Sequence, residues 1–337
     1  MYIASYMFGY ANWYEGGLSR DVMFFVPFMQ VLLIGPVIYF YTKSLLQVSF
    51  KVGKKDLIHF LPSILYMIYS IIVFVTDVLI LDTYYFYADG RDKDLAIWYQ
   101  TAGFISMAFY LVLSLRFYSD YKKLAFDKVS FAESILFQWI RNFAIALLVV
   151  LTLRGIFFFT NSVWEEYGSQ FWYYLCFSLI FYYISINGYS NAIRISALSD
   201  IKSKEIDVFK QELEMKEEVV SDEKNIEEWK QKISVLMVEQ EVFKNPRLTL
   251  SDLATTLNTT TKTISYTVNN GFQMNFNDFI NLHRIEAVKK KLSNKEHKSH
   301  TLLGIALDCG FNSKATFNRS FKKFTGMNPQ DFLKNNA

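Results

Sequence analysis

Five long apolar stretches between residues 22 and 193 limit what this chain can fold into more than any other feature. A helix that crosses about 30 Å of hydrocarbon needs about 20 residues, and each stretch is that long. Buried helices of soluble proteins are usually shorter and carry a polar face, whereas polar residues such as Gln138 and Asn187 are isolated here. The sequence therefore predicts membrane-spanning helices, at roughly Val22–Thr42, Leu57–Ile80, Ile97–Phe117, Ile135–Phe159 and Gln170–Ala192.

The segment before the first stretch, Met1–Tyr14, is apolar and aromatic but only 14 residues long. It has neither a basic start nor a small-residue cleavage site, so the pattern is not that of a signal peptide. Two interpretations stay open. The segment is an interfacial stretch on the outer side, or it is the stub of a further span, in which case the five spans are the remnant of a larger set.

The loops between the predicted spans alternate between basic and non-basic. The positive-inside rule places lysine-rich loops in the cytoplasm. We therefore expect a multi-pass protein of the inner (cytoplasmic) membrane, with the lipid bilayer as a partner and the C-terminal part in the cytoplasm. The basic residues that set this topology are Lys43, Lys51, Lys54, Lys55, Arg116, Lys122, Lys123, Lys128, Arg194, Lys202 and Lys204.

Two charged residues within the predicted spans, Asp77 and Arg154, are candidates for sensing a signal. Charges inside a membrane are costly and suggest a function by default. Both fall about one turn from the outer end of their spans. They either pair with each other or line an outward-facing pocket, or they are interfacial charges that reach water.

Charge divides the chain into unlike parts. The first 193 residues hold 13 basic and 13 acidic side chains, and the last 144 hold 22 and 19. Within the second part, Asp200–Glu241 has a net charge of −6, and Val242–Ala337 has a net charge of +8. The acidic stretch predicts a solvated helix or a flexible tether, with a short dimerising coil, and hence a homodimer, left open. The basic stretch suits nucleic acid, although anionic lipid attracts the same charge.

The basic stretch contains two helix-turn-helix patterns. In the first, Ser251 is the expected N-cap, Asn258 stops the helix, and Thr260 caps the second helix. In the second, the turn falls at Cys309-Gly310, and Ser313 caps the following helix. A long helix, at about Phe276–Leu292, is predicted between the two units, with apolar residues that pack onto both.

The run IALDCGFNSKATFNRSFKKFTGMNP resembles the DNA-binding domain of AraC-type transcriptional regulators, and the resemblance covers roughly residues 230–334. The apolar part resembles membrane-embedded bacterial regulators of this type in GPVIYFY (Gly35–Tyr41) and HFLP (His59–Pro62). We expect an all-α chain, a polytopic transmembrane helix bundle followed by a soluble two-unit helix-turn-helix domain. The predicted domains are residues 1–193 in the membrane, a charged helical linker at 194–229, and the DNA-binding domain at 230–337.

The resemblance implies that each unit places its second helix in the major groove of double-stranded promoter DNA. The first helix would present Lys262, Ser265 and Tyr266 to the bases, and the second would present Lys314, Ala315, Thr316 and Arg319. Lys322 and Lys323 would meet phosphate. The chain departs from the family in one place, because Phe272-Gln273 stands where a Thr-Gly pair is usual, which predicts a different turn after the first unit.

No catalytic motif accompanies these features. The chain lacks a phosphate-binding glycine loop, a nucleophile elbow and an HExxH sequence, so we expect neither an enzyme nor a cofactor. His297 and His300 are three residues apart without carboxylate or cysteine neighbours, and the two cysteines are far apart, so no metal site is predicted. The predicted function is a membrane-bound, sequence-specific DNA-binding transcription regulator that responds to an unknown signal or ligand; the alternative is a small membrane transporter or anchor protein with a basic accessory domain.

Overall fold

The fold was taken from a computed structural model, which describes residues 21–22, 25–27, 30–47, 50–89, 93–160, 171–197, 199–214, 225–294, 296 and 299–336. Most of these residues are helical and none of them forms a β-strand; an isolated antiparallel bridge joins Val129 to Thr249. The chain divides into two compact units. One comprises residues 1–118 and 138–188, and the other comprises residues 119–137 and 189–337. The predicted N-terminal segment Met1–Tyr14 lies outside the described residues.

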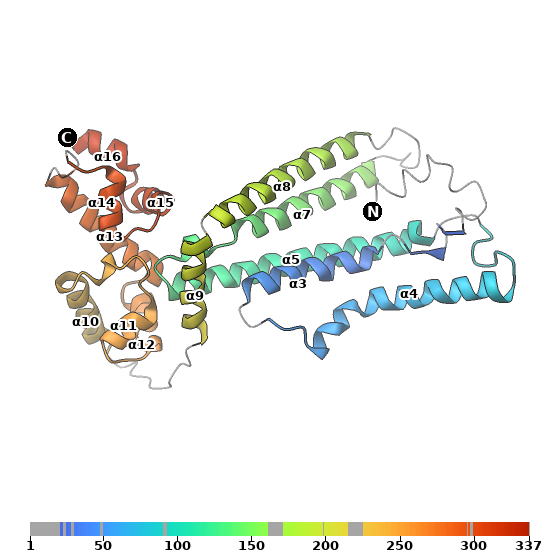
Figure 1. The fold of residues 1–337 in the computed structure, drawn as a ribbon, viewed down its shortest axis with the longest axis horizontal. Helices are drawn as coiled ribbons and strands as arrows, with labels where there is room; N and C mark the ends of the chain where they lie inside the picture. Colours follow the sequence, from blue (N-terminus) through green and yellow to red (C-terminus); the bar gives the residue numbers. More distant parts are fainter. Residues whose placement is uncertain are drawn as a thin grey trace. The chain divides into compact units, whose positions relative to one another are not determined.

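The first unit is built from long apolar helices (Figure 1). Among the described residues, three helical stretches are long and apolar enough to cross a membrane: Lys54–Ile80, Ile97–Lys128 and Gln138–Ile156. The helices are α3 (Val31–Leu46), α4 (Leu61–Phe74), α5 (Ile97–Lys128), α7 (Gln138–Thr160) and α8 (Phe171–Ala197), with η1 (Lys54–Phe60), η2 (Val75–Ile80) and η3 (Lys93–Leu95).

Three of the five predicted spans thus coincide with helices of spanning length. The first predicted span, Val22–Thr42, overlaps α3, which begins at Val31 and has 16 residues. Just before Val31, Gln30 Nε2 donates a hydrogen bond to the Pro27 carbonyl at 2.9 Å. The fifth predicted span falls on α8, some of whose side chains lie outside the described residues.

Small residues let the apolar helices approach closely, as is common between membrane helices. A Cβ atom added at Gly35 of α3 would lie 2.8 Å from the ring of Tyr110 and 3.2 Å from the carbonyl oxygen of Ser106, both on α5. One added at Gly103 of α5 would lie 2.4 Å from the side chain of Val31. These contacts agree with Figure 1, in which α3 lies along α5.

Asp77 and Arg154 contact different groups. Asp77 is 2% exposed. Its carboxylate accepts hydrogen bonds from the backbone N–H groups of Phe86 and Tyr87, at 3.1 and 3.3 Å, which ties the end of the helix to the following loop. Arg154 Nη2 donates to Gln100 Oε1 at 3.0 Å. The sensing role of both residues stays a prediction.

Among the described residues of the second unit, helix α13 (Phe276–Ser293) joins two hydrophobic cores. The first core includes Leu253, Ile264 and Phe279, and the second includes Val288, Phe317 and Phe321. Helix α13 contributes to both cores, as predicted for the helix between the two units. The elements are α6 (Ala132–Ile135), α9 (Ser199–Glu214), α10 (Ile226–Glu239), η4 (Val242–Lys244), α11 (Leu250–Thr256), α12 (Thr261–Tyr266), η5 (Thr267–Gly271), α13 (Phe276–Ser293), α14 (Leu302–Asp308), α15 (Lys314–Thr325) and α16 (Pro329–Asn336).

Helix α9, at the start of the predicted linker, is not a solvated helix. Phe209 is buried, and its ring meets Tyr121 edge to face at a centroid distance of 5.7 Å. Glu205 and Glu212 are also buried. The apolar stripe is thin, but it packs against the segment that follows α5, within the same compact unit. Residues 215–224 of the predicted linker lie outside the described residues.

Candidate nucleic-acid interface

The first helix-turn-helix unit is formed by α11 and α12. Its N-cap is Thr249 and not Ser251 as predicted: Thr249 Oγ1 accepts from the Asp252 amide at 3.1 Å, and the Asp252 carboxylate accepts from the Thr249 amide at 2.8 Å. This reciprocal capping box satisfies two helix-end donors at once, whereas a cap at Ser251 satisfies one. The turn is as predicted, with Asn258 in the left-handed region (φ 49°) and Thr260 capping α12.

The turn after the first unit keeps a left-handed residue without using glycine. Gln273, which stands in place of the family's usual glycine, has φ 55°. The preceding helix widens into the π-turn η5, and the Phe272 amide donates to the Thr267 carbonyl at 3.2 Å. A side chain in this region of φ costs about 1–2 kcal/mol, so the departure from the family is tolerated at a cost in stability.

The second helix-turn-helix unit is formed by α14 and α15, and its predicted turn and N-cap are confirmed. Gly310 has φ 94° in the turn, and Ser313 Oγ accepts from the Thr316 amide at 3.2 Å at the start of α15. A Cβ at Gly310 would lie 2.5 Å from the carbonyl oxygen of Phe243, so only glycine fits this approach to η4.

The predicted reading residues of α12 lie on the outer side of that helix. Lys262 and Tyr266 are exposed, and Ser265 is half-buried. Ile264 and Val268 face the core, so packing fixes which face of α12 is presented.

Most of the predicted contact residues of α15 are exposed, and one is not. Lys314, Ala315, Arg319, Lys322 and Lys323 are exposed. Thr316 is 4% exposed, and its hydroxyl lies 2.9 Å from Ser313 Oγ, so this side chain completes the cap. A direct contact of Thr316 with a base therefore has no support in the geometry.

Asn318 is a polar residue of α15 that the sequence reasoning missed. It is exposed, and it lies four residues after Lys314 and four before Lys322, so the three side chains form one row on the helix surface. An asparagine can bind adenine N6 and N7 with two hydrogen bonds. Lys314 and Lys322 are eight residues apart, so a search for polar residues at four-residue spacing along the helix would have identified Asn318.

Two of the predicted DNA-contact residues of α15 form ion pairs with other parts of the second compact unit. Arg319 Nη1 lies 2.8 Å from Glu133 Oε1, and Lys323 Nζ lies 2.6 Å from Asp278 Oδ2. Asp278 belongs to α13, but Glu133 belongs to α6, in the segment between the apolar helices α5 and α7. No sequence signal paired Glu133 with α15.

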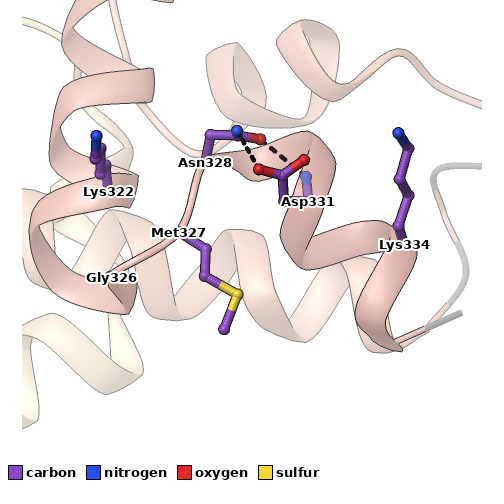
Figure 2. A pocket seen from close by; sticks show the side chains of 6 residues that line it. All are labelled: Lys322, Gly326, Met327, Asn328, Asp331 and Lys334. Atoms are coloured by element: carbon purple, nitrogen blue, oxygen red, sulfur yellow. Dashed lines mark hydrogen bonds between the residues drawn. The ribbon is translucent and has the colours of Figure 1, made fainter.

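Lys322 also flanks a shallow hollow between the end of α15 and α16 (Figure 2). Asn328 and Asp331 are hydrogen-bonded across its floor, where the Asp331 amide donates to Asn328 Oδ1 at 2.8 Å. Lys334 stands on the opposite side from Lys322 (Figure 2). The two lysines extend the basic surface of the second unit beyond α15.

A buried arginine ties α13 to the chain that enters the first helix-turn-helix unit. Arg284 is 1% exposed, and burial lowers its pKa to about 9, so the guanidinium remains charged at neutral pH. Its Nε donates to the Phe243 carbonyl at 2.8 Å, and its Nη2 donates to the Asn245 carbonyl at 2.8 Å. Because these carbonyls belong to the chain entering the first unit, Arg284 fixes α13 relative to that chain.

The described residues contain no cluster of three or more His, Cys, Asp or Glu side chains that is arranged to hold a metal; His297 lies outside them.

Comparison with known proteins gives a family match for the C-terminal helices. Residues 253–335 match a family model described as a helix-turn-helix domain, of the AraC type. No curated protein and no solved structure matches the chain. The matched residues begin within α11 and end within α16, so they cover most of the first helix-turn-helix unit and all of the second. The family is a DNA-binding regulatory one and not a family of enzymes. The match over residues 253–335 supports a DNA-binding role of the AraC-type helix-turn-helix kind for this part of the chain.

Proposed function

We propose that the protein is a membrane-bound transcription regulator, in which the apolar helices anchor the chain in the cytoplasmic membrane and α12 and α15 enter successive major-groove segments of promoter DNA. One observation carries the proposal. In both helix-turn-helix units the second helix buries its apolar face in a core and leaves basic side chains exposed, Lys262 on α12 and Lys314 on α15. This is the arrangement that direct base readout requires.

The DNA-binding part of the proposal is tested with the full chain in lipid nanodiscs. A random-sequence duplex pool is the probe, and its retention is measured against salt concentration. Neutralised phosphates release counterions, so the affinity falls steeply as salt rises. Lys262→Ala combined with Lys314→Ala weakens retention, whereas Lys232→Ala, which removes a lysine of α10 paired with Glu228, leaves it unchanged. A chain that retains no duplex at about 50 mM salt, neither as wild type nor as Glu133→Gln, refutes the proposal.

The membrane part of the proposal rests on the three helical stretches of spanning length. The chain is expected to stay with the membrane fraction at alkaline pH, and a cytoplasm-active reporter fused to the C-terminus is expected to be active. A periplasm-active reporter that works in the same position contradicts the proposed topology.

The sensing role belongs to the same proposal. Asp77 ties η2 to the following loop, and Arg154 of α7 binds Gln100 of α5, so both hold helix ends where a signal can change packing. The test is transcription of a reporter gene in strains carrying Asp77→Asn or Arg154→Gln. A wild-type response in both strains removes these residues from the mechanism.

A further inference from the structure

The segment Val129–Ile135, here called the docking segment, packs into the DNA-binding part of the chain. Val129 and Ser130 are fully buried, as are Phe131, Ala132 and Ile135. Val129 forms an antiparallel bridge with Thr249, the N-cap of α11, and the Ser130 amide donates to the Leu248 carbonyl at 3.0 Å. The segment connects α5 to α7, so two apolar helices lead directly into the contact.

Buried polar groups of α13 make the contact specific. Asn277 Nδ2 donates to the Ser130 carbonyl at 2.8 Å, and Arg284 Nη2 donates to Ser130 Oγ at 3.1 Å. Both α13 side chains are buried. A buried donor that loses its acceptor carries a desolvation penalty, so these bonds favour one register of the docking segment.

The docking segment also forms an ion pair with Arg319, the arginine predicted to contact bases. Glu133 Oε1 lies 2.8 Å from Arg319 Nη1, with the Glu133 side chain 12% exposed and the Arg319 side chain 55% exposed. Arg319 shares the outer surface of α15 with the exposed Lys314, Asn318 and Lys323. A carboxylate held at this surface repels phosphate and competes with guanine for the same N–H donors.

A second connection reaches the start of the same reading helix. Asn312, which directly precedes the N-cap of α15, donates from Nδ2 to Glu205 of α9 at 2.9 Å. Helix α9 packs against α6 of the docking segment and follows the apolar helix α8 along the chain. The two chain segments that lead out of the apolar helices therefore both hold α15.

From these contacts we propose that the docking segment is an intramolecular binding site that holds the second helix-turn-helix unit in a DNA-incompetent state, with Glu133 as the group that competes with DNA for Arg319. The inference rests on the proposed function and adds its regulation. A change in the packing of the apolar helices shifts the docking segment and α9, which releases α15 to the groove. The apparent affinity for DNA is then set by the fraction of released molecules.

The test compares Glu133→Gln with wild type in the full chain in nanodiscs, with the random-sequence duplex pool as the probe. Glutamine keeps the shape of the side chain and removes the charge, so the fold is retained. Glu133→Gln is expected to bind duplex about 2- to 5-fold more tightly, because a partly exposed ion pair is lost and the released fraction rises. Glu286→Gln is the matched control: it removes one surface acid, paired with Lys289 on α13, and is expected to change the affinity less than about 2-fold.

A second readout is hydrogen exchange of the docking segment. Duplex added to the wild-type chain is expected to speed exchange of the Ser130 amide, because release breaks its bond to Leu248. If duplex binds equally to wild type and Glu133→Gln while the Ser130 amide stays protected, the inference is wrong and the proposed function stands. If neither protein binds duplex at low salt, the proposed function fails and the inference fails with it.

Discussion

Replacing Gly310 by alanine tests how tightly the turn of the second helix-turn-helix unit is held against η4. Gly310 has φ 94°, and an added Cβ would lie 2.5 Å from the Phe243 carbonyl oxygen and 2.8 Å from the Cα of Lys244. Both are backbone atoms, which cannot rotate away as a side chain can. Gly326, at the end of α15, is the matched control, because it has φ 77° but no atom within 4 Å of an added Cβ.

The two substitutions should lower stability by different amounts, because only one of them also creates a steric clash. A left-handed alanine costs about 1–2 kcal/mol, and this strain is common to both. Forcing an extra methyl group into a packed site costs about a further 1–3 kcal/mol, and only Gly310→Ala carries this cost. The free energy of opening the second helix-turn-helix unit should therefore fall by about 2–5 kcal/mol for Gly310→Ala and by about 1–2 kcal/mol for Gly326→Ala.

Hydrogen exchange with mass spectrometry on the full chain measures these changes, since amide exchange reports local opening. Each 1.4 kcal/mol is tenfold in an equilibrium constant, so Gly310→Ala should speed exchange in α14 and α15 by about 30-fold or more. Gly326→Ala should speed it by about 5- to 30-fold. Exchange in α12, which belongs to the first core, is the internal reference. Equal effects of the two substitutions would show that the approach to η4 does not hold the turn.

Three further predictions concern other residues of the second compact unit. Gln273→Gly removes the left-handed strain, offset in part by glycine's greater chain entropy, and is expected to raise stability by about 0.5–1 kcal/mol in thermal unfolding, whereas Gln273→Ala, which keeps the strain, gives no gain. Asn318→Ala is expected to lose about 1–3 kcal/mol of discrimination at one adenine, measured by selecting bound sequences from the duplex pool; unchanged sequence preference would remove Asn318 from readout. Burial raises the pKa of the Glu212 carboxyl, against the opposing polar groups of Ser251 and Thr249 and the charge of Lys128. The docked α9 therefore binds a proton more tightly than the released helix, and its packing is strongest below the usual pKa of 4.5 and weakens as the pH rises through the raised value. Exchange of α9 amides, corrected for the intrinsic rate, should show this dependence, and Glu212→Gln should abolish it.

Local signals in the sequence were enough to locate the helix-turn-helix units. Asn258 and Gly310 were predicted in the turns, Thr260 and Ser313 were predicted as caps, and the structure has all four in those roles. A cap or a left-handed turn depends on bonds within three or four residues, so its signal is contained in a short stretch. The same holds for the long apolar helical stretches Lys54–Ile80 and Gln138–Ile156, because length and hydropathy are read from one segment at a time.

Two finer choices within these elements were predicted wrongly, although each depends on residues only three positions apart. Ser251 and Thr249 are both good caps, and the reciprocal bonds with Asp252 decide for Thr249. Thr316 and Arg319 were both predicted to meet bases, yet the first is buried beside Ser313 because it closes the N-terminal turn of α15.

By itself, then, the sequence determined an all-helical chain with long apolar helices, a basic C-terminal part and two helix-turn-helix units whose second helices have defined outward faces. Only the tertiary structure decided that residues 119–137, between two apolar helices, join the DNA-binding part in one compact unit. The bond from Arg284 to Ser130 spans 154 residues of chain, and the Glu133–Arg319 pair joins segments comparably far apart. Periodicity and capping report only neighbours along the chain, so contacts between distant segments, which depend on how whole helices pack, leave no such signal.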